Sequence, residues 1–110
     1  MLLDFDKMER QELPHFKGGE KALLAEMFAD ENNRILRGRL VPGATVGLHT
    51  HTGNSEIIYI LEGRGTVLYD GAAEPVQAGV CHYCPEGHAH TLRNDSDADL
   101  VFFAVVPQHG

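Results

Sequence analysis

Short apolar segments, interrupted at close intervals by Gly, Pro, Asn and Asp, dominate the chain from residue 35 to residue 107. These segments read ILRGRLV, ATVGLHTH, EIIYILEG, GTVLYDG, EPVQAG, VCHYC, HTLRN and LVFFAVV. Turn residues at such regular spacing are typical of antiparallel strands that form a barrel or a sandwich. The sequence therefore predicts an all-β domain.

The length of 110 residues is enough for one hydrophobic core and too short for two. Residues 1–20 contain Pro14 and a Gly-Gly pair, and we expect an N-terminal arm or short helix followed by a loop. Residues 21–110 would form the barrel. Within them, the segment KALLAEMFA at residues 21–29 has good helix propensity. It is short and everything after it is strand-like, so we interpret it as a strand.

The net charge of −7 argues against non-specific binding to nucleic acid and to an anionic membrane surface. An acidic small molecule stays possible, because a bound cation can reverse the local potential. No stretch resembles a signal peptide, and no run approaches the roughly 18 apolar residues of a spanning helix. We therefore expect a cytoplasmic protein.

The stretch HTHTGNSE places His49, His51 and Glu56 close together. Residues two apart in a strand point to the same face, so the two imidazoles can aim at one point. The intervening Thr-Gly-Asn-Ser would reverse the chain and bring the carboxylate to that point from the next strand. Two histidines and a carboxylate suit a divalent transition metal.

The wider spacing around these residues follows two motifs. The first, at residues 43–63, reads G-x5-H-x-H-x4-E-x6-G, and the second, at residues 79–94, reads G-x5-P-x-G-x2-H-x3-N. This pattern resembles both signature motifs of the cupin superfamily, over roughly two-thirds of the chain. The resemblance implies a single-domain jelly-roll β-barrel whose central metal is held by His49, His51, Glu56 and His90. It also implies that Asn94 ties down the backbone of the following turn.

The ligand set does not choose among Mn, Fe, Co, Ni, Cu and Zn. A six-coordinate ion would keep two positions for a polar, oxygen-rich small molecule. The resemblance allows dioxygenase, isomerase or lyase chemistry. The alternatives are a non-catalytic module that binds a sugar or organic acid through the metal, and a barrel whose metal is purely structural.

Two residues are candidates for catalytic groups near such a site. His88 lies two positions before His90, beside a Pro-x-Gly turn, and is either a proton shuttle or an exposed loop histidine. Tyr83 follows His82 directly in a strand, so only one of these two can face the cavity.

Arg37 and Arg39 share a strand face and are either a clamp for a substrate carboxylate, or solvated or subunit-contact residues. Cys81 and Cys84 form a C-x-x-C, which can signal a redox pair. In a strand they would point to opposite faces at about 10 Å, beyond the roughly 7 Å limit for a disulfide. We interpret them as ordinary strand cysteines.

The segment EIIYILEG at residues 56–63 is apolar on both faces. A strand of this kind is normally buried on both sides, and in a chain this small a second subunit could cover the outer one. We therefore expect a homodimer.

Overall fold

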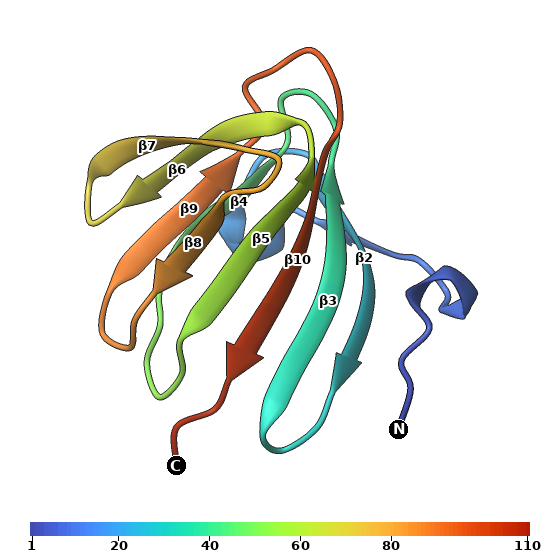
Figure 1. The fold of residues 1–110 in the computed structure, drawn as a ribbon. Helices are drawn as coiled ribbons and strands as arrows, with labels where there is room; N and C mark the ends of the chain where they lie inside the picture. Colours follow the sequence, from blue (N-terminus) through green and yellow to red (C-terminus); the bar gives the residue numbers. More distant parts are fainter.

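A computed structural model describes residues 1–110, in which ten strands form two antiparallel sheets that face each other across a barrel (Figure 1). The strands are β1 (Gln11–Pro14), β2 (Ala22–Ala29), β3 (Asn33–Leu40), β4 (Thr45–Thr50), β5 (Glu56–Glu62), β6 (Arg64–Tyr69), β7 (Ala72–Gln77), β8 (Cys81–Cys84), β9 (Ala89–Arg93) and β10 (Leu100–Pro107). The predicted all-β jelly roll is confirmed.

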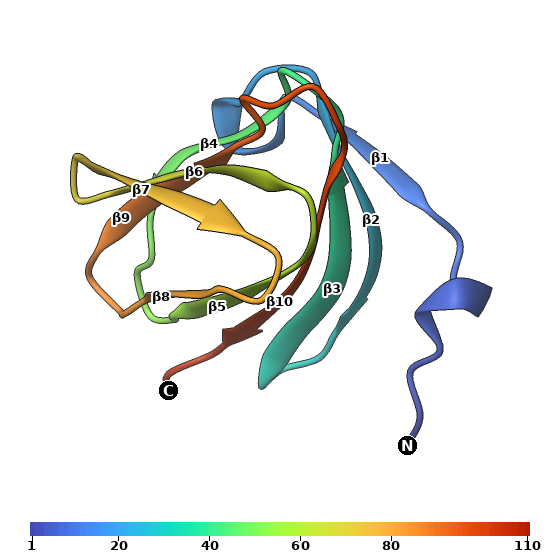
Figure 2. The ribbon, with the colours of Figure 1, turned by 45° about the horizontal axis from the view of Figure 1, so that its top comes forward.

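Neighbouring strands in each sheet come from distant parts of the chain. The larger sheet has the order β1-β2-β3-β10-β5-β8, and the smaller one β4-β9-β6-β7. Figure 2 shows the two sheets curving around a common interior. Because the chain passes back and forth between the two sheets, residues of the first motif, on β4 and β5, lie close to residues of the second motif, on β9.

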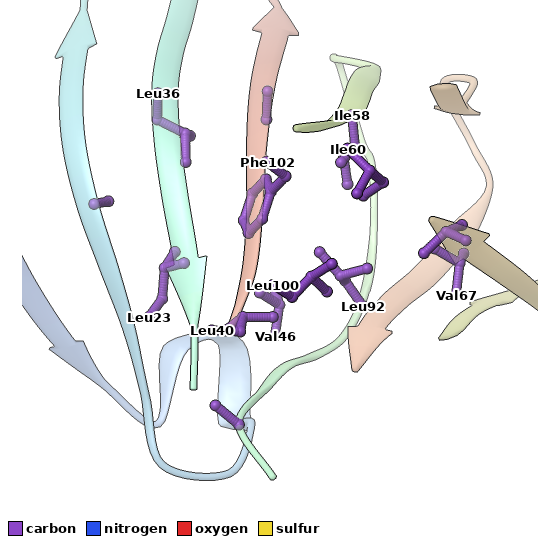
Figure 3. Packing of buried hydrophobic residues seen from close by; sticks show 14 residues of the cluster. Leu23, Leu36, Leu40, Val46, Ile58, Ile60, Val67, Leu92, Leu100 and Phe102 are labelled. Carbon is purple, nitrogen blue, oxygen red and sulfur yellow. The ribbon is translucent and has the colours of Figure 1, made fainter. Parts of the chain in front are cut away.

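The inward faces of both sheets supply one hydrophobic core (Figure 3). Alternation along β10 buries Leu100, Phe102 and Ala104 fully. The ring of Phe102 lies where a Cβ at Gly38 of the adjacent strand would be, 2.4 Å from the nearest ring atom. Only glycine at residue 38 therefore leaves room for this aromatic side chain.

Residues 22–29 form strand β2, so the strand interpretation of this segment is confirmed against its local helix propensity. Leu23 and Ala25 alternate inward and are fully buried, while β2 pairs with β3 from Leu24 to Ala29. Tertiary burial and the backbone ladder outweigh propensities of a few tenths of a kcal/mol per residue.

The predicted N-terminal arm contains one strand of the larger sheet, because β1 pairs with β2. The 3₁₀ turn η2 (Phe16–Gly18) then rests on β4. A Cβ at Gly47 of β4 would meet the backbone oxygen of Lys17 at 1.9 Å, so the two backbones pass in direct contact. The residues before β1 contact the outer face of the larger sheet, where the ring of Phe5 lies edge-on against Phe103 and Asp6 accepts a hydrogen bond from Arg37. The structure contains no helix with the length and apolar character needed to cross a membrane.

The outer face of the larger sheet carries both charged pairs and exposed apolar side chains. Arg37 donates to Glu26 and Asp6, and Arg39 donates to Asp99. Carboxylates of this chain thus pair with both guanidinium groups, and neither arginine lines the cavity described below, which favours their interpretation as surface residues.

Along β5, the side chains Ile57, Tyr59 and Leu61 point outward and are 38–44% exposed. The inward residues of the same strand, Ile58 and Ile60, are buried. The two-faced apolar character of β5 is therefore confirmed, and the homodimer that would cover its outer face stays a prediction.

Candidate metal centre

Four side chains from both sheets converge on one point inside the barrel. His49 lies on β4 and pairs in register with His90 of β9, His51 follows the end of β4, and Glu56 begins β5. Their ligand atoms lie within 4.8 Å of one another. The structure thus brings together all four residues that the resemblance implied as ligands, as a group able to hold a metal ion.

The distances among these four atoms fit a six-coordinate ion. The Nε2 atoms of His49, His51 and His90 are 2.9–3.3 Å apart. Glu56 Oε1 lies 3.1 Å from His51 Nε2, 2.9 Å from His90 Nε2, and 3.8 Å from His49 Nε2. Ligand atoms about 2.1 Å from a metal are about 3.0 Å apart when adjacent in an octahedron, and about 3.4 Å apart in a tetrahedron.

Five short separations and one long one match an octahedron better than a tetrahedron, in which all six would be equal. An octahedral ion held by these residues would have His49 and Glu56 at opposite positions and would keep two adjacent positions for other ligands.

Each of the three imidazoles is oriented by a hydrogen bond at Nδ1, the ring nitrogen that faces away from the site; the bond made by His90 is described below. His49 Nδ1 donates to the backbone oxygen of Gly47 at 2.8 Å, and His51 Nδ1 donates to Asn54 Oδ1 at 2.5 Å. A ring that donates from Nδ1 presents the lone pair of Nε2. The lone pairs of these Nε2 atoms and the carboxylate of Glu56 repel one another at such short distances unless a cation lies between them. The donor set therefore fits a metal ion.

The charge of Glu56 is secured by its neighbours. Burial alone would raise the pKa of this carboxyl group, but its interactions with the rings of His49, His51 and His90 outweigh burial and hold the pKa well below its usual range. The same contact with Glu56 raises the pKa of His51. In the metal-free protein Glu56 is therefore ionised, and His51 binds a proton more readily than an ordinary histidine. A metal ion must displace that proton when it binds.

A cavity of about 260 Å³ opens beside the four ligands. Its apolar wall belongs to the core, and its side chains include Leu36, Ile58 and Phe102. Its polar residues other than the four ligands are Lys17, Arg34, Thr50, Thr52 and Asn54. The volume lies just below the roughly 300–1,000 Å³ of typical ligand pockets, which suits a small molecule.

His90 is supported by a second histidine. His82 is buried on the inner face of β8, and its Nε2 lies 2.9 Å from His90 Nδ1. Burial and the nearby His90 lower the pKa of His82 to about 4, so the ring is neutral near pH 7 and accepts the proton of His90 Nδ1. His82 thus orients a ligand of the candidate metal centre from behind.

Replacing His82 with Phe is expected to weaken metal affinity about tenfold to a hundredfold, the usual cost of losing such a supporting hydrogen bond. The measurement is a competition titration against a chromophoric chelator. The matched control is Cys81→Ser, an exposed change on the same strand. Unchanged affinity in a folded His82→Phe variant would show that His90 needs no support from behind.

The two cysteines lie on opposite faces of β8, as predicted, and both are free thiols. Cys81 is exposed, while Cys84 is buried and sits near His82 and His90. Burial raises the pKa of Cys84 to about 11, so the group remains a protonated thiol and packs as an apolar side chain.

Neither candidate catalytic residue lines the cavity. Strand alternation turns His82 inward and leaves Tyr83 56% exposed on the outer face. His88 precedes β9 and bonds on the outside of the barrel to Asp70 Oδ2, with Tyr69 stacked against its ring. The backbone of the turn that carries His88 helps to position His51, because the His51 N–H donates to the His88 backbone oxygen.

Sequence reasoning missed three residues that the structure brings to the site, namely Arg34, Lys17 and Asn54. Arg34 has a recognisable signal, because it shares the inward parity of Leu36 and Leu40 on β3. Lys17 has none, since its place depends on how η2 packs on β4.

Comparison with known proteins agrees with this architecture. A family model described as a cupin domain matches residues 36–106. An oxalate-binding protein of Thermotoga maritima is 34% identical over 112 residues, covering 96% of this chain and 93% of that protein.

Solved structures show the same fold. A Thermotoga maritima structure described as a predicted oxalate decarboxylase has a TM-score of 0.92 and 29% identity, covering 98% of this chain and 99% of that one. A structure described as a cupin-superfamily sugar phosphate isomerase from Silicibacter pomeroyi has a TM-score of 0.80 and 24% identity, covering 98% and 76%. The latter similarity concerns the fold alone.

The paired sheets, the four converging ligands and the family match define a jelly-roll barrel with a histidine-rich centre. The chain belongs to the cupin family.

Proposed function

We propose that this protein holds a divalent transition metal through His49, His51, Glu56 and His90, and that it binds a small oxygen-rich acid on that metal. The observation that carries the proposal is the spacing of the four ligand atoms, with one long separation between His49 and Glu56. A six-coordinate ion held at this spacing would keep two adjacent coordination positions, which would suit two oxygens of a single molecule.

Oxalate is the first acid to test, since it offers two oxygens on adjacent carbons. The 34% identical relative that spans nearly the whole chain is an oxalate-binding protein, which supports this choice. When bound, the metal would polarise the oxygens of a chelated acid or, as iron, activate dioxygen.

The protein's own residues have separate tasks. The three histidines and Glu56 hold the metal, while Gly47, Asn54 and His82 fix the imidazole rings. The apolar wall limits water around the bound molecule. Reaction of the acid, by dioxygenase, isomerase or lyase chemistry, is the catalytic form of this proposal.

A non-catalytic binding module is the second candidate. It is favoured by the cavity's other polar groups, Lys17, Arg34, Thr50, Thr52 and Asn54, which are suited to binding and orienting a ligand. The two residues considered for proton transfer, His88 and Tyr83, point away from the cavity.

The test is calorimetric titration of oxalate into metal-free protein and into protein reloaded with one equivalent of Mn²⁺, Fe²⁺ or Zn²⁺. We expect uptake of metal, and oxalate binding only to the loaded protein. Recovery of oxalate unchanged after long aerobic incubation would favour the binding module, and its loss would favour an enzyme. Equal oxalate binding with and without metal, or no metal uptake, would overturn the proposal.

A further inference from the structure

The candidate ligand cavity is positively charged in a negatively charged protein. Its lining contains two basic side chains, Lys17 and Arg34, and a single acidic one, Glu56. The whole chain carries a net charge of −7. With Glu56 committed to the metal, the cavity keeps two uncompensated cations beside a divalent ion, and this local excess attracts anions.

Arg34 is directed into the cavity by strand alternation. It is the second residue of β3, and Leu36 and Leu40 on the same face belong to the core. Across the ladder it pairs in register with Val106 of β10, which also lines the cavity. The neighbouring Arg37, on the other parity, points outward to Glu26.

Arg34 also differs from the other arginines of the larger sheet region in its contacts. Arg10, Arg37 and Arg39 each pair with a carboxylate of this chain. Arg34 is half-buried at the cavity and makes no ion pair or side-chain hydrogen bond in the structure. A guanidinium group withdrawn from water without a counter-ion costs free energy that a bound anion would offset.

Lys17 brings the second charge to the cavity from a separate element. It lies in η2, whose backbone is held in contact with β4 through Gly19 and Gly47. Lys17 is exposed, so water screens its charge and its contribution is smaller than that of Arg34. The two cations come from different elements of the chain and share one pocket.

We infer that the ligand of this cavity is a small acid with a second anionic group, a carboxylate or a phosphate, which Arg34 binds with help from Lys17. This inference rests on the proposed function, in which the other end of the same molecule chelates the metal. A guanidinium fork binds either anion through two parallel hydrogen bonds. Leu36, Ile58 and Phe102 form an apolar wall that offers an anion no hydrogen bond. Arg34 is the half-buried cation of the lining and can therefore bind the anion.

The test compares acids that share one metal-chelating end and differ in the other. Malate, 3-phosphoglycerate and 2-hydroxybutyrate all carry an α-hydroxy-carboxylate, with a carboxylate, a phosphate and a methyl group at the far end. Each is titrated calorimetrically into desalted protein loaded with one equivalent of Mn²⁺. We expect at least one of the two acids with a second anionic group to bind about tenfold to a hundredfold more tightly than 2-hydroxybutyrate, in line with charge-assisted hydrogen bonds.

The variant Arg34→Gln should lose this preference and keep both its metal content and its affinity for 2-hydroxybutyrate. Arg34→Lys, which keeps the charge without the planar fork, should retain part of it. Arg64→Gln removes the same charge from an exposed position outside the cavity, and should behave as wild type. The relative affinities for malate and 3-phosphoglycerate tell which anion the subsite prefers.

Equal affinities for all three acids in the wild type, or a preference that survives in Arg34→Gln, would overturn this inference while leaving metal chelation intact. Binding of none of the three acids to metal-loaded protein would instead contradict the proposed chelation itself, and this inference with it. Metal content, measured by mass spectrometry on each sample, separates either result from a failure to load the ion.

Discussion

Replacing His90 with Ala is expected to abolish stoichiometric metal binding. His90 Nε2 lies within 3.3 Å of the three other ligand atoms, so its loss opens one whole side of the cluster. Losing a supporting hydrogen bond usually costs about tenfold to a hundredfold in affinity, and losing a ligand should cost more. The measurement is metal content by mass spectrometry after purification without chelators, and again after reloading and desalting.

The matched control is His88→Ala, which removes a histidine two residues away on the outside of the barrel. Its contact with Asp70 is half exposed, so the change should have little effect on stability or metal content. Retention of one equivalent of metal by a folded His90→Ala variant would show that His90 is not a ligand. Loss of metal from His88→Ala would show that the turn acts on the site through more than its backbone.

Loading with metal is expected to raise the melting temperature by about 15 °C or more. A ligand present at about a thousand times its dissociation constant stabilises the folded state by about 4 kcal/mol. In a domain of this size each kcal/mol moves the melting temperature by roughly 4–8 °C. Differential scanning fluorimetry of metal-free and reloaded protein measures the shift, which His90→Ala should lose.

The size of this shift should grow as the pH rises from about 5.5 to 8. In metal-free protein the contact with Glu56 raises the pKa of His51, so protonated His51 contributes stability below its ordinary pKa of 6.5. This contribution is lost as the pH rises through the raised pKa, whereas metal binding needs the neutral ring and strengthens. His82, with its pKa lowered to about 4, stays neutral in both folded forms, so its effect cancels in the difference. A shift that is constant or shrinks with pH would contradict histidine ligation.

Much of the site was predictable because its signals are local. The pair His49 and His51 shares a strand face by simple alternation, and a turn of small polar residues brings Glu56 back. The role of Asn94 was also predicted correctly, since its side-chain amide donates to the backbone oxygen of Ala98 in the following turn, and also to that of Leu40 at the end of β3.

The sequence left alternatives open where a side chain's role depends on contacts between distant strands. The sequence left Arg37 as either a substrate clamp or a surface residue, and the fold places Glu26 and Asp6 beside it. Tyr83 and His88 were near the ligands in sequence, but strand alternation and an outward turn directed both side chains away from the cavity.

By itself, the sequence determined the strand-and-turn pattern, the family and the four candidate ligands, because alternation along a strand and reversal at a turn act over a few residues. Only the tertiary structure decided that His82 supports His90, and that Arg34 enters the cavity without a carboxylate partner. These contacts depend on which strands become neighbours and in what register, as when β4 pairs with β9 from 41 residues away. That pairing is set by burial of the whole core, which no short stretch of sequence contains.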